Sequence, residues 1–147
     1  MQDNRLRASI AHAVVRLFRL VNRASNRALG EQQLSAEQAH ILSVLWFEGP
    51  MTMGKLQRQL ALSSPTLTGA IDRMEKQELV RRVPDPADRR ASLREPRLSA
   101  RARARIEAVL DESERRCFAV LTAAERKELL RLLDKCIAHL EPDAAAR

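Results

Sequence analysis

Residues 62–76 read LSSPTLTGAIDRMEK, and this stretch decides the fold of the 147-residue chain. A serine followed by a proline is typical of a helix start, because serine caps the first N–H groups and proline fits the first turn. The stretch predicts a helix from Pro65 to about Gln77. One side of this helix is apolar and consists of Leu67, Ala70, Ile71 and Met74. The other side carries small and hydroxylated residues first and basic residues later, which suits a helix that enters the major groove of DNA.

Two further helices are predicted before this stretch. Ser35 and Gln38 have the spacing of a capping box, and Gly49-Pro50 ends the helix that this box begins. Thr52 caps a short helix that runs to about Leu60. The short helix and the one after it are joined by a tight turn. Together they have the pattern of a helix-turn-helix.

Two short strands are predicted after the helix-turn-helix. They span Leu79–Val83 and about Leu93–Leu98, around the loop PDPADRRA. Pro96 interrupts the second strand, so we expect that strand to lie at an edge or to be bulged. A hairpin in this place is a wing, and an arginine at its tip suits a narrow minor groove. The alternative is a solvated turn in which Asp88 bonds to Arg90. The two interpretations are compatible, because that pair would fix the loop while Arg89 points outward toward DNA.

Long amphipathic helices are predicted at both ends of the chain. The first runs from about Asn4 to Leu29, has a basic ridge opposite its apolar stripe, and is expected to end at Gly30. The ridge is either a solvated face or a binding face. Near the C-terminus, Thr122 and Glu125 form a second capping box within two helical segments. Apolar helices that flank a compact central module predict a homodimer.

The charge of the chain is concentrated in two segments. The whole sequence has 22 Arg and 4 Lys against 19 acidic residues, a net charge of +7. Residues 1–30 contribute +5 and residues 81–105 contribute +6, whereas the other two parts contribute −2 each. Such a basic protein needs an acidic partner, and nucleic acid is the commonest one. No apolar stretch reaches the length of a membrane span and no secretory signal is present, so we expect a cytoplasmic protein with no membrane partner.

Several other classes of site are disfavoured by the sequence. Cys117 and Cys136 lie on apolar stripes, so we expect buried, inert thiols, although pairing across a dimer interface stays open. The three histidines are isolated from one another, which argues against a metal site. No nucleophile elbow, glycine-rich phosphate loop or paired histidine and carboxylate motif is present. We therefore predict neither an enzyme nor a cofactor.

Taken together, these motifs resemble those of the MarR (multiple antibiotic resistance regulator) family of winged helix-turn-helix transcription factors. The matching segments, with x for positions that do not count, are LSxxQxxIL (34–42), Leu45, GPMT (49–52), Leu56, LxLSSPTLTxxIDRME (60–75), LVRR (79–82) and DPxDRR (85–90). The resemblance implies a mainly α fold with a small β wing. Residues 1–34 would be an N-terminal dimerisation helix, residues 35–98 the DNA-binding domain and residues 99–147 the C-terminal dimerisation helices. It also implies binding to pseudo-palindromic operators in double-stranded DNA.

The family pattern also implies roles for individual residues. Six residues become major-groove or phosphate contacts: Ser63, Ser64, Pro65, Thr66, Thr68 and Arg73. Arg89 or Arg90 becomes the minor-groove contact, with Asp88 supporting the wing. Glu78 stands where the family usually has glycine, and a left-handed glutamate there would cost about 1 kcal/mol. Two further departures are Gln57, in place of a small residue, and a wing about two residues longer than usual.

Many family members bind small aromatic or phenolic anions between the dimerisation helices and the winged module, which weakens DNA binding. The candidate residues here are His12 and Arg16 on the first helix and His40 and Trp46 on the second. A guanidinium and imidazoles beside an aromatic wall would suit an anion. In the alternative interpretation, Trp46 belongs to the core and His40 is a satisfied polar residue.

The sequence therefore predicts a DNA-binding transcriptional regulator, a repressor released by a small aromatic or phenolic ligand. One alternative is a regulator that needs no ligand. Another is an architectural DNA-binding protein that competes with other DNA-binding proteins.

Overall fold

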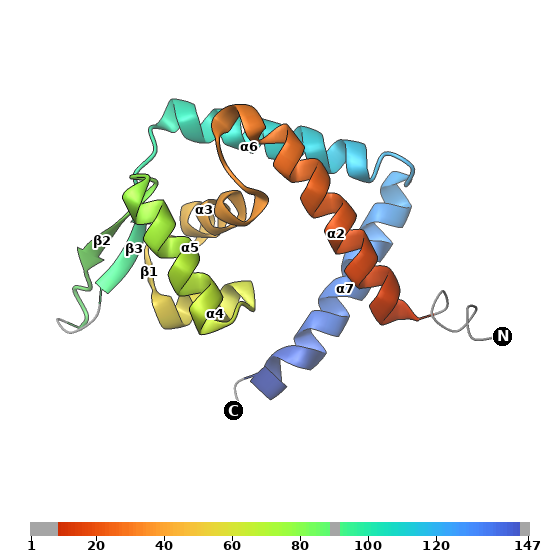
Figure 1. The fold of residues 1–147 in the computed structure, drawn as a ribbon. Coiled ribbons are helices and arrows are strands. Elements are labelled where there is room, and N and C mark those ends of the chain that lie inside the picture. The colour runs from red at the N-terminus through yellow and green to blue at the C-terminus, as the bar shows by residue number, and fades with distance from the viewer. Residues whose placement is uncertain (1–8, 89–91, 145–147) are drawn as a thin grey trace.

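The computed structural model describes residues 9–88 and 92–144. The elements follow in the order α2 (Ile10–Ala28), η1 (Gly30–Gln32), α3 (Ala36–Glu48), β1 (Met51–Thr52), α4 (Met53–Leu60), α5 (Ser64–Lys76), β2 (Val80–Pro84), β3 (Ser92–Pro96), α6 (Ala100–Cys117) and α7 (Ala123–Ala144). In Figure 1 the winged module of α3 to β3 lies on the left, and the long helices α2 and α7 lie on the right. Helix α6 runs across the top between the two parts. Among the described helices, none has the length and apolar character needed to cross a bilayer.

The two predicted capping boxes are confirmed, whereas α2 begins at Ile10 after a Ser9 cap and the start predicted near Asn4 lies outside the described residues. The Ser35 side chain accepts from the Gln38 N–H while the Gln38 side chain accepts from the Ser35 N–H, which completes a capping box. Thr122 and Glu125 form the same reciprocal pair before α7. Each pair satisfies backbone N–H groups that a helix start leaves without an intrahelical partner, so these local patterns are strong signals.

Three turns end on left-handed residues that are not glycine: Gln33, Ala61 and Glu78, with φ of 55°, 51° and 58°. After each, a leucine N–H reaches back to the carbonyl five residues earlier, as from Leu79 to Met74 at 2.9 Å. This is the Schellman arrangement, in which the leucine also anchors the turn to the core. Gly30 has the predicted position just after the end of the first helix, because α2 ends at Ala28 with Leu29 as its cap, but the left-handed turn comes later, at Gln33 after η1.

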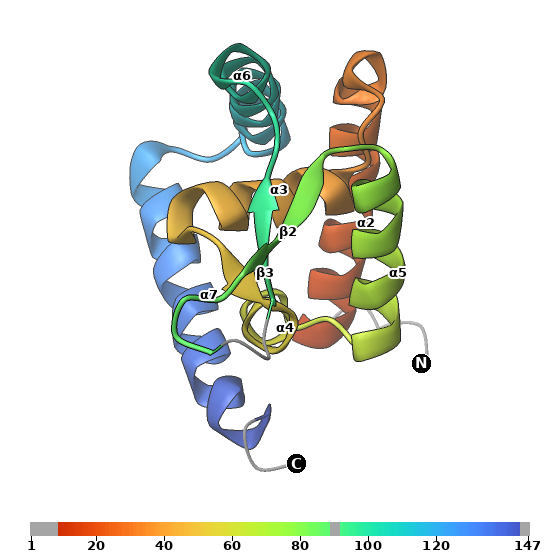
Figure 2. The ribbon, with the colours of Figure 1, turned by 90° about the vertical axis from the view of Figure 1, so that its left-hand side faces the viewer.

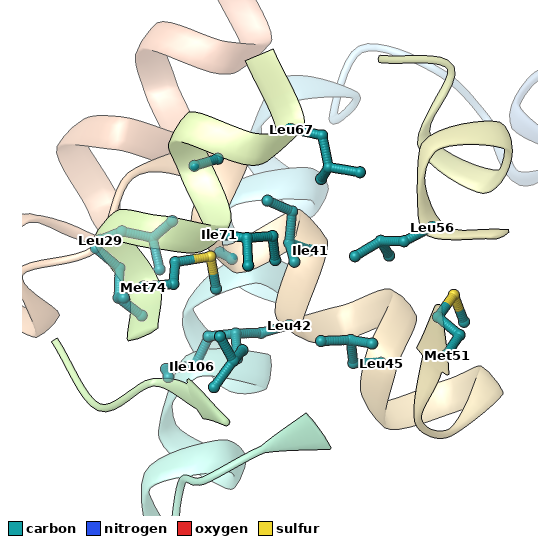
Figure 3. Close-up of a cluster of buried hydrophobic side chains, with 14 residues drawn as sticks. Leu29, Ile41, Leu42, Leu45, Met51, Leu56, Leu67, Ile71, Met74 and Ile106 are labelled. Carbon is teal, nitrogen blue, oxygen red and sulfur yellow. The ribbon is translucent and has the colours of Figure 1, made fainter. Parts of the chain in front are cut away.

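The core of the winged module forms around α3. Ile41, Leu42 and Leu45 of α3 are at most 1% exposed. Figure 3 shows them between Ile71 and Met74 of α5 and residues of β1 and α4. The four apolar residues predicted to face inward from α5 are all buried. Burial of such side chains is worth about 1.5–3 kcal/mol each, so the position of α5 on α3 is firmly set.

The sheet has three antiparallel strands in the order β1-β3-β2. The prediction that the strand with Pro96 lies at an edge is therefore wrong, because β3 is central. Proline is tolerated for two reasons. The two residues of β1 pair only with Leu93 and Arg94. Pro96 faces Val80 in a non-hydrogen-bonded pair, next to the bond from the Arg97 N–H to the Leu79 carbonyl. The N–H that proline lacks would not have pointed at β2, so the ladder between β2 and β3 loses no hydrogen bond.

The two terminal helices leave large apolar faces uncovered in a single chain. Helix α2 packs along α6, yet Ile10, Phe18 and Leu20 remain 81%, 66% and 49% exposed. In α7, no side chain described is fully buried. Its exposed apolar residues include a stripe at helical spacing: Leu130, Leu133, Ile137 and Leu140. Exposed apolar surface on this scale is typical of a protein interface.

Candidate nucleic-acid interface

Helix α5 presents a polar face to solvent at its N-terminal end. Ser63 caps the helix, and its Oγ lies 2.7 Å from Oγ1 of Thr66. All six residues predicted to contact DNA are exposed: Ser63, Ser64, Pro65, Thr66, Thr68 and Arg73. The structure thus brings these residues together on the side of α5 that faces away from the core. The positive end of the helix dipole favours a phosphate group here.

Arg73 is held only weakly. Its Nη2 atom lies 4.0 Å from Oε1 of Glu37, and both side chains are largely exposed. A Cβ at Gly69 would lie 3.4 Å from the guanidinium, so a glycine one turn earlier leaves room for this arginine. An exposed ion pair at this distance contributes little, so Arg73 is free to exchange Glu37 for another acceptor.

The wing is only partly described. Strand β2 is followed by a turn in which the Asp85 carboxylate accepts from the Ala87 N–H at 2.8 Å. Asp88 is exposed at the end of this described segment. Arg89 and Arg90, the predicted minor-groove contacts, lie outside the described residues. Figure 2 shows β2 and β3 side by side, with α5 beside them and α4 below.

A cluster of charges that the sequence analysis missed joins the wing to α5. Glu75 of α5 lies 2.9 Å from Nε of Arg82 on β2 and 3.1 Å from Nε of Arg94 on β3. Arg94 is 5% exposed and also donates to the Ser92 hydroxyl at 2.9 Å. Burial lowers the pKa of Arg94 and Glu75 opposes this effect, whereas Glu75 raises the pKa of Arg82. Both arginines stay charged, so one carboxylate ties two strands to the helix.

A crevice of about 750 Å³ lies between α2, α3 and α6. Its lining includes all three phenylalanines of the chain: Phe18, Phe47 and Phe118. Of the four predicted ligand residues, only His40 lines it. Trp46 is half-buried and packs against the core, and His12 and Arg16 lie on the exposed N-terminal half of α2. The structure therefore does not gather these four residues into one site.

The charged groups of the crevice are mostly acidic. Arg103 lies over the rings of Trp46 and Phe47, at 5.3 and 5.9 Å from their centres, and donates to Glu107 at 2.8 Å. Asp111 and Glu114 line the crevice as well. His40 keeps an exposed edge, but desolvation of its ring lowers its pKa, so this histidine is neutral at neutral pH. One guanidinium thus faces three carboxylates.

Cys117 is half-buried and Cys136 is exposed, so the prediction of a buried thiol is wrong for Cys136 in the single chain. Among the described residues, no three histidine, cysteine or carboxylate side chains are grouped as metal ligands would be.

Comparison with known proteins identifies the winged module. The model of the MarR family matches residues 34–92. The HTH-type transcriptional regulator YsmB of Bacillus subtilis is 36% identical over 83 residues, which cover 56% of this chain and 57% of YsmB. The winged module of this chain, residues 34–92, is similar to the MarR family. The family consists of transcriptional regulators, not enzymes. The chain matches less than two thirds of the length of the curated relatives to which it is similar.

Two solved structures share the fold over most of this chain. A mutant of MarR from E. coli in complex with operator DNA superposes with a TM-score of 0.78, over 86% of this chain and 92% of that one, at 22% identity. BpsR of Bordetella bronchiseptica superposes with a TM-score of 0.75 at 25% identity, over 88% and 93% of the two chains. The BpsR structure addresses how 6-hydroxynicotinic acid regulates DNA binding by that protein. The predicted fold, mainly α with a small β wing, is thus confirmed.

Proposed function

We propose that this protein is a dimeric, sequence-specific DNA-binding transcriptional regulator that represses its target genes. The observation that carries the proposal is the exposed polar face of α5, with its capped N-terminus and its hydroxylated first turn. The match of residues 34–92 to the MarR family model and the excess of arginine support the same conclusion. A helix end of this kind approaches DNA closely while its basic residues neutralise phosphates.

In this proposal the two ends of the chain form the dimer. Residues 1–34 and 99–147 supply dimerisation helices, and residues 35–98 supply the DNA-binding domain. The exposed apolar stripes of α2 and α7 support this division, because a second copy of the chain would remove them from water. A two-fold dimer places two α5 helices in successive major grooves, so its operator is pseudo-palindromic.

The proposed contacts divide into two groups. Ser63, Ser64, Pro65, Thr66, Thr68 and Arg73 meet the major groove and its phosphates. Arg89 or Arg90 enters the adjacent minor groove from the wing, which Asp88 supports. Only contacts to base edges select a sequence, whereas phosphate contacts set the position of the protein on the duplex.

A small aromatic ligand releases the repressor in this account. The crevice supports this part of the proposal because it lies between the winged module, through α3, and the terminal helices α2 and α6. A molecule bound there contacts both parts, and it shifts their relative orientation if it fits one orientation better. The spacing of the two α5 helices on DNA then changes.

The proposal is tested by selecting bound fragments from a random double-stranded DNA library with the purified full-length protein. We expect an enriched inverted repeat whose half-sites lie about 10 base pairs apart, one turn of the duplex. Enrichment of no sequence over the starting library would contradict a sequence-specific regulator and support an architectural DNA-binding protein.

A further inference from the structure

The crevice between α2, α3 and α6 differs from the site expected for an aromatic anion. One face of α6 supplies much of its wall, because residues 103, 107, 111, 114 and 118 follow one another at intervals of three or four. Three of these residues are carboxylates: Glu107, Asp111 and Glu114. The single guanidinium on this face, that of Arg103, is already bonded to Glu107. An anion placed here would meet Asp111 and Glu114, and the crevice lining holds no second cation.

The two carboxylates that Arg103 does not engage have no ion-pair partner among the described residues of the crevice. Among residues 9–88 and 92–144, no ion pair engages Asp111 or Glu114. His40 adds no positive charge at neutral pH, since desolvation lowers its pKa. Arg115, Arg126 and Lys127 line a neighbouring cavity with Asp111 and Glu114, but these three cations do not line the crevice.

The apolar part of the lining favours an aromatic cation over a small hydrated one. Phe18, Phe47 and Phe118 come from three different elements and converge on the crevice. Phe47 is 75% exposed, which is unusual for a ring next to a packed core. The faces of aromatic rings attract cations and also pack against flat ligands. A cavity of about 750 Å³ is large enough for two or three fused rings.

We propose that this crevice binds planar aromatic cations, with Asp111 and Glu114 supplying the counter-charge and the three phenylalanines the aromatic walls. This inference rests on the proposed function, because it names the class of molecule that would release the repressor. It reverses the charge expected from the sequence, where His12, Arg16 and His40 suggested an anion. It leaves Arg103 as a wall residue whose charge Glu107 neutralises.

Isothermal titration calorimetry of the full-length protein without DNA tests this inference with three probes of one ring system. N-methylquinolinium is a cation, quinoline is neutral at neutral pH, and quinaldate is an anion. We expect the cation to bind at least about tenfold more tightly than quinaldate, as two partly exposed charge contacts allow. Equal affinities, tighter binding of quinaldate, or no binding of the cation would overturn the proposal.

Matched variants locate the site. Asp111→Asn combined with Glu114→Gln removes two charges and keeps the shapes, and it should weaken the cation about tenfold while leaving quinoline unchanged. Glu31→Gln combined with Glu48→Gln removes two charges from residues that do not line the crevice, and it should leave the affinity unchanged. Similar losses in both double variants would contradict the assignment. Phe47→Leu should weaken the cation more than quinoline.

A separate titration with DNA distinguishes this inference from the proposed function. If N-methylquinolinium binds in the crevice but leaves DNA affinity unchanged, the ligand class stands and the release mechanism fails. If specific DNA binding is found but the cation does not bind, the regulator stands and the ligand class fails.

Discussion

Arg94 on the central strand of the wing and Glu75 on helix α5 form an ion pair at 3.1 Å, with the Arg94 side chain only 7% exposed. The same carboxylate holds Arg82 of the outer strand at 2.9 Å. Glu75 therefore joins both strands to the proposed recognition helix, and Asp72 of the same helix lies 3.8 Å from Arg82. In a winged helix that reads two grooves at once, these contacts fix the angle between the two reading elements.

Removing that carboxylate should destabilise the protein. Glu75→Gln leaves the buried guanidinium of Arg94 without its counter-charge, and we expect the free energy of unfolding to fall by about 2 kcal/mol. Chemical denaturation at a fixed protein concentration measures this loss. The matched control is Glu95→Gln, which breaks the exposed pair with Arg81 and should cost less than about 0.5 kcal/mol. Equal losses in the two variants would show that the Arg94 pair has no special role.

The left-handed Glu78 should be improved by glycine. Its φ of 58° strains a side chain, and its ion pair with Arg97 is exposed. We expect Glu78→Gly to raise the free energy of unfolding by about 1 kcal/mol. Lys76→Gly, two residues earlier within α5, should lower it by about 1 kcal/mol because helical glycine is unfavourable. Thermal denaturation of both variants checks the prediction, which is wrong if Glu78→Gly is destabilising.

The apolar stripe on α7 should control assembly. Ile137 is 52% exposed in the single chain, and a glutamate in its place would bury two charges in a two-fold interface. We expect Ile137→Glu to weaken the dimer at least about 100-fold, as measured by sedimentation equilibrium. Lys135→Glu introduces the same residue on the opposite face of α7 and should leave the dimer intact. If Lys135→Glu weakens the dimer more than Ile137→Glu does, the dimer interface does not include the apolar stripe of α7.

His40 should make stability depend on pH. The unfolded chain takes up a proton on this residue near the ordinary pKa of 6.5, whereas desolvation lowers the pKa in the folded state. As the pH falls through 6.5, the unfolded state binds more protons and the folded state loses stability relative to it. Above that pH both states are neutral and the contribution vanishes. The wild type should therefore lose stability relative to His40→Asn between about pH 7.5 and pH 5, and a constant difference would contradict this.

The elements set by local chemistry could be predicted from the sequence. Ser35 with Gln38 and Thr122 with Glu125 mark their helices because each pair satisfies its own N–H groups. The buried side of α5 follows from its apolar spacing. The turn at Gln33 was missed because the residue is not glycine, and β1 was missed because two residues show no periodicity.

The candidate site was only partly accessible to sequence reasoning. The residues on the exposed face of α5 lie close together in the chain, so their spacing alone brings them together. Glu75 and Arg94 are separated by β2 and the wing, and nothing in the local pattern indicates their pairing. The crevice is assembled from three distant phenylalanines, and only tertiary packing shows that its charges are mostly acidic.

The central claim is that this protein selects one DNA sequence over others. The most direct test is a fluorescence anisotropy titration of the full-length protein on the DNA upstream of its own gene and on a scrambled copy, across a salt series. Specific regulators prefer their sites by about 1,000-fold or more, and we expect that preference here, with affinity falling steeply as salt rises. Equal affinity for the two DNAs at every salt concentration would contradict an operator at this site.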